Sequence, residues 1–327
     1  MTITSPEPAI VVNGLRKSFG DHVVLDGIDL DIRAGTIFSL LGPNGSGKTT
    51  TVRILSTLIP ADDGEATIAG HDLKAEADGV RSAIAVTGQF SAVDKMLTGR
   101  ENLLLMGRLN RLSRQDARTR AGELLDRFDL ADAADKYTMT YSGGMKRRLD
   151  LAMSLAGRPE IIFLDEPTTG LDPRSRRTMW ELIRELASDG VTIFLTTQQL
   201  EEADHLADRI ALLDQGKLVA EGTPDELKSR IPGGHISLQF ADQHQLEAAA
   251  EAVDDSTSDP EKLTLQVPSD GSVDLLRTLL DRLSGMPVTV EKLAIHTPDL
   301  DDVFFALTGH KGARQSEVIS ENATARK

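Results

Sequence analysis

Apolar and polar positions change their period several times along the chain, and these changes mark the predicted elements. Three apolar runs have the length of buried parallel strands and cover residues 36–41, 161–164 and 191–197. Helical spacing follows the first run over residues 49–58, and a second helical stretch places Met145, Leu149, Ala152, Met153 and Ala156 on one face. Buried strands that alternate with helices predict an α/β fold for this part of the chain.

Residues 93–158 contain few strand-like runs and are predicted to form a helical subdomain. The apolar residues at its start are more numerous than one helix face needs. Part of this set is therefore expected either to pack in the core or to dock a partner helix, and the sequence leaves both interpretations open. The residues concerned are Leu97, Leu103, Leu104, Leu105, Met106 and Leu109.

A helix-breaking Pro-Gly-Gly at residues 232–234 predicts a boundary between a first domain, residues 1–230, and a second, residues 235–310. Beyond the boundary the period restarts and predicts a small α+β unit. Its expected strands are residues 235–240, 263–267 and 288–295, and its expected helices are residues 243–253 and 273–283. Phe304, Phe305 and Leu307 are expected to staple a terminal helix onto this unit or across a dimer, and the polar tail at 311–327 is predicted to be disordered.

Composition narrows the class of protein. The 327 residues carry a net charge of −15 and include no cysteine, so a disulfide framework is excluded. No apolar run approaches the about 18 to 20 residues of a membrane-spanning helix, and the N-terminus lacks a signal region, so the chain is expected to stay in the cytosol. The acidic balance argues against a nucleic-acid partner.

The strongest local motif lies between the first predicted strand and the helix that follows it. Residues 42–49 match the phosphate-loop pattern G-x-x-x-x-G-K-[ST] in the strand-to-helix setting that the pattern requires. Backbone N–H groups of such a loop wrap phosphates, while Lys48 is predicted to reach the β- and γ-phosphates and the Thr49 hydroxyl to hold Mg²⁺. The predicted nucleotide-binding residues here are Gly42, Pro43, Asn44, Gly45, Ser46, Gly47, Lys48, Thr49 and Thr50.

Two carboxylates directly follow the second predicted strand. In a nucleotide-binding sheet, Asp165 can hold the Mg²⁺ shell while Glu166 polarises the attacking water. A third element, Ser-Gly-Gly-Met at residues 142–145, opens a predicted helix with Ser142 as its N-cap. Its hydroxyl, the glycine N–H groups and the helix N-terminus predict a second anion-binding site.

Together these motifs and their order resemble the ATP-binding cassette (ABC) family, the ATPase subunits of ABC transporters, over residues 9–228. The resemblance implies a phosphate-loop domain with a mixed sheet and a helical subdomain, which binds ATP and Mg²⁺. It implies that Phe19 stacks on adenine, that Gln89 links the metal site to the helical subdomain, and that Asp172 lies in a loop at a dimer interface.

The same resemblance identifies residues 142–145 as the family's signature loop, which faces the ATP of the opposite subunit. The loop consists of Ser142, Gly143, Gly144 and Met145, and both Tyr141 and Met145 depart from the usual Leu and Gln. The phosphate loop of one subunit and the signature loop of the other would each form half of one ATP site, which implies a homodimer that sandwiches two ATP molecules. Binding of ATP then favours the closed dimer, and hydrolysis releases it.

After the third predicted strand, Gln198 stands where the family has its switch histidine. An amide can hydrogen-bond the γ-phosphate but cannot become positively charged. We therefore expect Glu166 to be the main catalytic base and Gln198 to be a neutral γ-phosphate sensor, with Lys48 as the third catalytic residue.

The stretch Leu-Asp-Asp-Val-Phe-Phe-Ala-Leu-Thr-Gly-His at residues 300–310 resembles the end of the daunorubicin/doxorubicin-resistance type of ABC ATPase. Such a chain pairs with a separate polytopic membrane permease at the cytoplasmic face of the membrane and powers export of drugs or lipids. An exporter ATPase for another cargo, such as a lipid or an ion, remains an alternative. A soluble ABC-type ATPase of translation or DNA repair is a further one, although the chain has one phosphate loop and no long heptad run.

Overall fold

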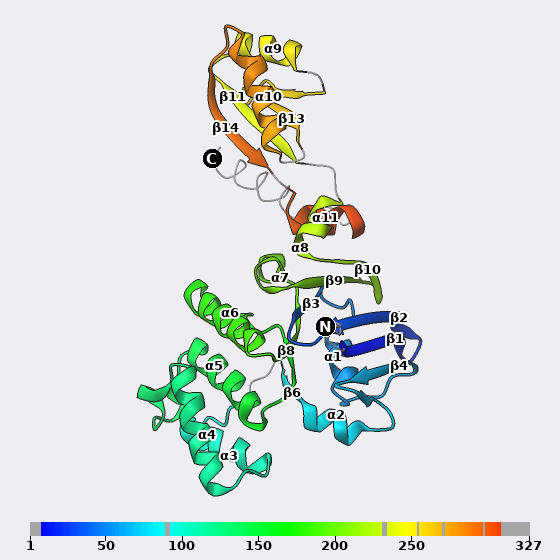
Figure 1. Ribbon diagram of the computed structural model, residues 1–327, viewed down its shortest axis with the longest axis vertical. Coiled ribbons are helices and arrows are strands. Elements are labelled where there is room, and N and C mark those ends of the chain that lie inside the picture. The colour runs from blue at the N-terminus through cyan, green and yellow to red at the C-terminus, as the bar shows by residue number, and fades with distance from the viewer. Residues whose placement is uncertain are drawn as a thin grey trace, which may run out of the picture. The chain divides into compact units, whose positions relative to one another are not determined.

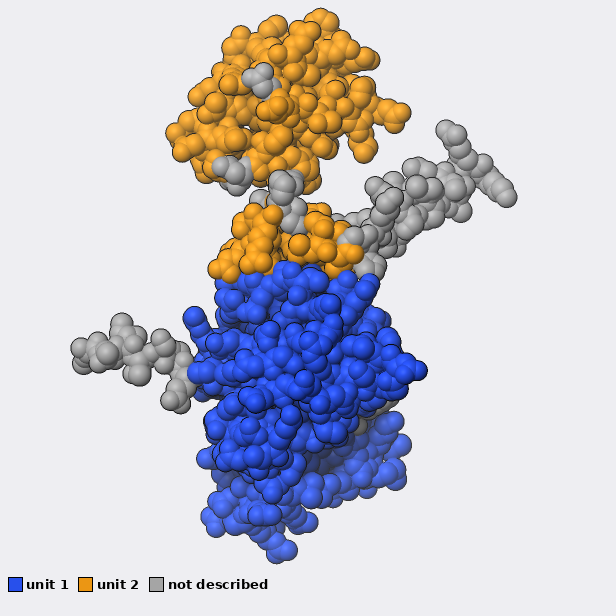
Figure 2. Space-filling model, turned by 90° about the vertical axis from the view of Figure 1, so that its right-hand side faces the viewer, with its two compact units in different colours: residues 1–224 blue, residues 225–327 orange. Residues whose placement is uncertain are grey.

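A computed structural model describes residues 8–88, 92–230, 234–253, 255–269, 272–296 and 298–308. The chain folds into two compact units, Met1–Pro224 and Asp225–Lys327 (Figure 1 and Figure 2). None of the helices that these residues form is long and apolar enough to cross a membrane. The boundary between the units precedes the Pro-Gly-Gly segment, part of which lies outside the described residues, as do residues 309–327.

A six-stranded mixed sheet forms the centre of the first unit, in the order β10-β9-β3-β8-β7-β6. Three of its strands are buried over their whole length, so the runs at 36–41, 161–164 and 191–197 are confirmed as core strands. The rings of Phe38 and Phe163 both pack on Phe194, at centroid distances of 5.6 and 5.3 Å. The strands are β3 (Ile37–Leu41), β6 (Ile84–Thr87), β7 (Ile161–Asp165), β8 (Thr192–Thr197) and β9 (Arg209–Asp214), which are parallel, and β10 (Lys217–Gly222), which is antiparallel to β9.

A second, antiparallel sheet has the order β2-β1-β4-β5 and was not predicted from the sequence. Its strands are β1 (Pro8–Phe19), β2 (His22–Arg33), β4 (Asp63–Ile68) and β5 (His71–Asp72). Ile10 and Leu25 of this sheet share a hydrophobic core with Phe38 of β3 and with Ile54 of helix α1 (Lys48–Leu55). The helix after the phosphate loop is therefore packed in the core between the two sheets, as Figure 1 shows.

Three α-helices, three short 3-10 helices and no named strand occupy the described part of the segment 93–158. The α-helices are α3 (Gly99–Leu109), α4 (Arg114–Arg127) and α5 (Gly143–Ser154). Each begins at a hydroxyl N-cap, namely Thr98, Ser113 and Ser142. Leu103 is buried at 1 % exposure, whereas Leu105 and Leu109 are 41 % and 67 % exposed. Core packing therefore uses only part of the leucine-rich stretch. The remaining helices of the first unit are α2 (Ala77–Ala83), α6 (Pro173–Ser188) and α7 (Leu200–Leu206).

The second unit contains the predicted α+β arrangement, an antiparallel sheet in the order β12-β13-β11-β14 with two helices packed on it. The strands are β11 (His235–Phe240), β12 (Thr257–Asp259), β13 (Thr264–Pro268) and β14 (Val290–His296), and the helices are α9 (Gln243–Ala252) and α10 (Val273–Ser284). The short β12 was not predicted. Two further helices are α8 (Pro224–Ser229) and α11 (Leu300–Thr308). In α11 the buried residues are Leu300 and Val303, while Leu307, expected to staple this helix, is 40 % exposed.

Candidate nucleotide-binding and catalytic site

The loop between β3 and α1 requires glycine at two positions. A Cβ on Gly42 would lie 2.2 Å from the Leu213 carbonyl oxygen, and one on Gly47 would lie 2.6 Å from Leu25 Cδ2. Gly47 also has a φ of 113°, which other residues adopt only with strain. The loop backbone thus lies close against its neighbours and leads directly into the N-terminus of α1, where backbone N–H groups can bind an anion.

Lys48 is the first residue of α1 and is only 5 % exposed. Its Nζ donates hydrogen bonds to the carbonyl oxygens of Gly42 and Pro43 at 2.8 and 3.0 Å. Burial lowers the pKa of its amine, while the nearby charges of Glu166 and Asp165 oppose this shift. A buried cation is therefore held inside the loop and close to two carboxylates.

The carboxyl ends of β7 and β8 bring hydroxyl and carboxylate oxygens together at the edge of the loop. Thr49 Oγ1 donates to the Asp165 carboxylate at 3.1 Å, and Thr196 Oγ1 donates to Asp165 Oδ1 at 2.5 Å. Hydroxyl and carboxylate oxygens are ligands that Mg²⁺ accepts, and Mg²⁺ usually keeps several waters besides them. The described residues contain no group of three or more His, Cys, Asp or Glu that could enclose a metal.

Glu166 follows β7 in a left-handed backbone conformation, with a φ of 50°. Its N–H donates to the Thr196 carbonyl oxygen at 3.0 Å, and its Oε2 accepts a hydrogen bond from the Thr169 hydroxyl at 3.2 Å. A residue other than glycine in this conformation is uncommon, and such strain gathers at functional sites. The turn thus directs the Glu166 side chain to the same cavity as the phosphate loop.

Arg147 of α5 was not predicted as a site residue, yet it holds this turn. Its Nε donates to the Pro167 carbonyl oxygen at 2.7 Å, and its other nitrogens donate to the carbonyls of Glu166 at 3.1 Å and of Gly88 at 3.1 Å. Burial lowers the pKa of the guanidinium, and the charge of Asp150 opposes that shift. Arg147 connects the helix of the signature loop to the carboxylate turn.

One cavity of about 440 Å³ joins the loop and the carboxylates. Phe19 lies at its rim with 51 % of its surface exposed, and Lys17 Nζ lies 5.4 Å from the centre of its ring. An exposed aromatic face at this position can stack on a base. The cavity is lined by Phe19, His22, Val24, Asn44, Gly45, Gly47, Lys48, Thr49, Thr50, Asp165 and Glu166.

The signature loop lies elsewhere: none of Ser142, Gly143, Gly144 and Met145 lines this cavity. Ser142 is the N-cap of α5, because its hydroxyl accepts from the Met145 N–H at 3.2 Å. Tyr141, which departs from the family's Leu, is buried and donates its hydroxyl to the Ala133 carbonyl oxygen at 2.7 Å. A Cβ on Gly144 would lie 2.5 Å from Ser175 Oγ, whereas one on Gly143 would meet nothing within 4 Å.

Asp172 and Gln198, which were also predicted as site residues, do not line this cavity. Asp172 is the N-cap of α6, accepting from the N–H groups of Arg174 and Ser175, and the hydrogen bond from the Ser175 hydroxyl is the main cause of its lowered pKa. Gln198 follows β8 on an exposed bend and is not among the lining residues. Gln89 lies outside the described residues.

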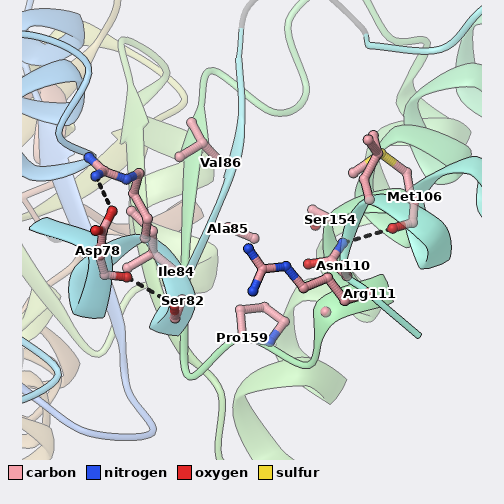
Figure 3. Close-up of a pocket in the computed structure, with 13 residues that line it drawn as sticks. Asp78, Ser82, Ile84, Ala85, Val86, Met106, Asn110, Arg111, Ser154 and Pro159 are labelled. Carbon is pink, nitrogen blue, oxygen red and sulfur yellow. Dashed lines mark hydrogen bonds and ion pairs between the residues drawn. The ribbon is translucent and has the colours of Figure 1, made fainter. Parts of the chain in front are cut away.

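A second hollow, of about 720 Å³, lies between the β6 side of the sheet and the end of α3 (Figure 3). Ile84, Ala85 and Val86 form one wall, and Figure 3 shows Met106 and Asn110 on the other. The Asn110 amide donates to the Met106 carbonyl oxygen at 2.9 Å. The full lining is Asp78, Arg81, Ser82, Ile84, Ala85, Val86, Met106, Leu109, Asn110, Arg111, Ser154, Gly157 and Pro159.

The parallel sheet, its phosphate loop and the carboxylates that share its cavity define a phosphate-loop nucleotide-binding protein. The ABC transporter family model matches residues 25–169. The chain is 48 % identical to the daunorubicin resistance ATP-binding protein DrrA3 of Streptomyces coeruleorubidus, over 93 % of this chain and 96 % of that protein. The chain belongs to the ABC transporter family as an ATP-binding subunit, and the predicted resemblance to the daunorubicin/doxorubicin-resistance type is confirmed.

Two other comparisons extend this result. The Nod factor export ATP-binding protein I of Sinorhizobium fredii (strain NBRC 101917 / NGR234) is 38 % identical, over 93 % of this chain and 87 % of its own length. A solved ATP-binding subunit of an ABC transporter is 26 % identical with a TM-score of 0.61, over 68 % of this chain and 92 % of that one. The predicted fold class is confirmed.

Proposed function

We propose that this chain hydrolyses ATP with Mg²⁺ and powers an exporter of hydrophobic drugs of the anthracycline type, or of lipids, through a separate membrane permease. The observation that carries the proposal is the single cavity that joins Lys48 and Thr49 to Asp165 and Glu166. The name of the Streptomyces relative supports a drug as cargo. The name of the Sinorhizobium relative favours the alternative, export of a different cargo by the same ATPase chemistry.

The cavity residues divide the binding of ATP among them. Phe19 stacks on adenine, the N–H groups of the glycine-rich loop bind phosphate oxygens, and Lys48 exchanges its loop carbonyls for the β- and γ-phosphates. Thr49 and Asp165, together with Gln89, would hold Mg²⁺, which neutralises phosphate charge when it is bound.

Glu166 acts as the base in the proposed hydrolysis: its carboxylate accepts a proton from the water that attacks the γ-phosphate. The hydrogen bond from Thr169 holds one of its oxygens, and Arg147 fixes the turn beneath it. Gln198 senses the γ-phosphate as a neutral amide, so it contributes a hydrogen bond but no charge.

Turnover of two variants tests this division of roles. Glu166→Gln keeps the shape of the side chain but removes the base, and is expected to abolish steady-state ATP turnover. Gln198→Ala removes only a neutral hydrogen bond and is expected to retain part of it. Equal and complete loss of turnover in both variants would overturn the assignment of the base.

The signature loop suggests that the complete site needs a second copy of the chain. Ser142 and Gly143 are exposed at the start of α5 and do not line the cavity of their own chain. In the proposed homodimer they close on the ATP held by the partner, and Asp172 lies at the interface. Light scattering of Glu166→Gln with saturating Mg-ATP is expected to give about twice the monomer mass of 35.4 kDa. A monomer under these conditions would contradict the sandwich.

The hollow beside α3 is the proposed contact with the permease, which would place the chain at the cytoplasmic face of the membrane. Two of its apolar lining residues, Leu109 and Val86, are 67 % and 37 % exposed, and exposed apolar side chains such as these can pack against an amphipathic helix. Leu109→Asp is expected to reduce the amount of chain recovered on membranes of producing cells. Leu58→Asp is the matched control, because Leu58 is 65 % exposed and does not line this hollow. Equal recovery of both variants would exclude the contact.

A further inference from the structure

A buried carboxylate that does not line the nucleotide cavity has no role in the mechanism described so far. Glu202 lies in the first turn of α7, four residues after Gln198, and is 1 % exposed. Its Oε1 accepts two hydrogen bonds, one from the Thr168 hydroxyl at 2.7 Å and one from the Trp180 indole N–H at 3.2 Å. Burial raises the pKa of its carboxyl, and the hydrogen bond from Thr168 is the main opposing influence.

The two donors come from the segments that carry the catalytic and dimer-loop residues. Thr168 is fully buried two residues after Glu166, and its carbonyl oxygen accepts from the Leu171 N–H at 3.1 Å, next to Asp172. Trp180 is buried in α6, the helix that Asp172 caps. A single carboxyl group therefore joins the loop from Glu166 to Asp172, the helix α6 and the helix that follows Gln198.

The chemistry of this junction argues against simple packing. A carboxyl group buried at this depth costs free energy unless hydrogen bonds compensate it, and an apolar side chain would fill the same space at a lower cost. The two hydrogen bonds that Glu202 accepts both go to Oε1 and are directional, so they fix the loop and the helices in one arrangement, whereas the buried Oε2 has no hydrogen-bond partner among the described residues. Catalytic groups need support of this kind, because small displacements reduce turnover strongly.

We propose that Glu202 is a positioning residue that holds the loop of Glu166 and the segment of Gln198 in the relative position that hydrolysis needs. The proposal rests on the proposed function only in taking Glu166 as the base. Glu202 contacts neither of these side chains through a hydrogen bond, so it acts through Thr168, Trp180 and the start of α7. It is predicted to affect the rate of hydrolysis and not the binding of ATP.

Kinetics of the full chain tests this split between kcat and KM. Glu202→Leu is expected to lower kcat about 10-fold or more with little change in KM for ATP, because the phosphate loop is untouched. Glu202→Gln is expected to retain most of kcat, since the amide oxygen accepts both hydrogen bonds. Thr168→Val is expected to lower kcat in the same direction, and the double variant with Glu202→Leu to be no slower than Glu202→Leu alone. The proposal would be overturned if Glu202→Leu had the wild-type kcat. It would also be overturned if the kcat of Glu202→Gln were as low as that of Glu202→Leu.

Thr192→Val controls for loss of stability, because Thr192 is equally buried and accepts a hydrogen bond from the Gly35 N–H at the opposite end of β8. It is expected to keep wild-type kcat in the folded fraction. If its kcat falls as far as that of Glu202→Leu, the effect is general destabilisation and the proposal fails.

Trp180 is the only tryptophan in the chain and gives a readout that does not depend on hydrolysis. Glu202→Leu is expected to shift its fluorescence emission in the folded protein, whereas Glu202→Gln is expected to leave it in place. Unchanged emission in Glu202→Leu would overturn the hydrogen-bonded junction. Normal turnover in Glu166→Gln would instead overturn the base, while the emission shift and the kcat loss of Glu202→Leu would still identify Glu202 as a positioning residue.

Discussion

Replacement of Arg147 by Met tests whether α5 holds the turn of Glu166, the proposed base. The side chain of Arg147 is 14 % exposed, and its guanidinium donates to the carbonyl oxygens of Pro167, Glu166 and Gly88. It also lies 3.5 Å from Asp150, which is 3 % exposed. Met fills the volume of the Arg stem but leaves these carbonyls and the carboxylate without their cationic donor.

The expected loss in the free energy of unfolding follows from these contacts. Hydrogen bonds from a charged group contribute about 1.5–3 kcal/mol each, but they are not additive. Removal of one partner of a buried ion pair costs about 3–5 kcal/mol, and we take this range for Arg147→Met. For a domain of this size, the melting temperature falls by about 2–4 °C for each kcal/mol lost from the free energy of unfolding. The melting temperature of Arg147→Met is therefore expected to fall by about 6–20 °C.

Turnover distinguishes a role at the site from a role in stability. Arg148→Met is the matched control, because Arg148 is the next residue of α5 and its guanidinium donates to the Phe128 carbonyl oxygen and the Asp129 carboxylate, away from the turn of Glu166. Both variants are measured by calorimetry and by ATP turnover at a temperature where they stay folded. We expect Arg147→Met to lose turnover and Arg148→Met to keep it. Folded Arg147→Met with wild-type turnover would refute the reasoning.

Four further predictions concern single groups. Lys48→Met is expected to weaken ATP binding at least about 10-fold in calorimetry, because a buried charge–phosphate contact is lost, and wild-type affinity would contradict its role. Tyr141→Phe removes the hydrogen bond to Ala133 and is expected to lower the free energy of unfolding by about 1 kcal/mol in urea titration, with ATP affinity unchanged; no loss of stability would count against this anchor. Gly144→Ala is expected to lower the melting temperature because its Cβ meets Ser175 Oγ, whereas Gly143→Ala is expected to leave it unchanged, and equal melting would exclude this close packing. Chelation of Mg²⁺ is expected to stop turnover, and turnover that persists in excess chelator would exclude the Mg²⁺ requirement.

Local sequence signals were sufficient for the parts of the fold that long apolar runs encode. Strands β3, β7 and β8 are buried on both faces and therefore read as continuous apolar segments. The antiparallel sheet gave no comparable signal, because β1 pairs with β4 across about 50 residues and its register is interrupted near Asn13. The three residues of β12 are too few to show any period.

The candidate site was predictable where a motif encodes it and unpredictable where the tertiary structure assembles it. The loop residues follow from one contiguous pattern, and Asp165 follows from the acid pair directly after an apolar strand run. Arg147 reaches carbonyls that lie 18 to 59 residues away in the sequence, and Glu202 lies 34 residues from Thr168, so no local pattern reveals either contact. The roles of Gln89, Asp172 and Gln198 stay predictions from the family resemblance.

Affinity purification of the Glu166→Gln chain from detergent-solubilised native membranes with ATP tests the exporter function most directly, with a parallel sample that lacks ATP as the control. The trapped ATP-bound state should keep its transport partner attached. Mass spectrometry is predicted to identify a stoichiometric membrane protein with several helices. Recovery of ribosomal or DNA-bound proteins without a membrane partner would contradict the account, although the chemistry of the ATP site would stand.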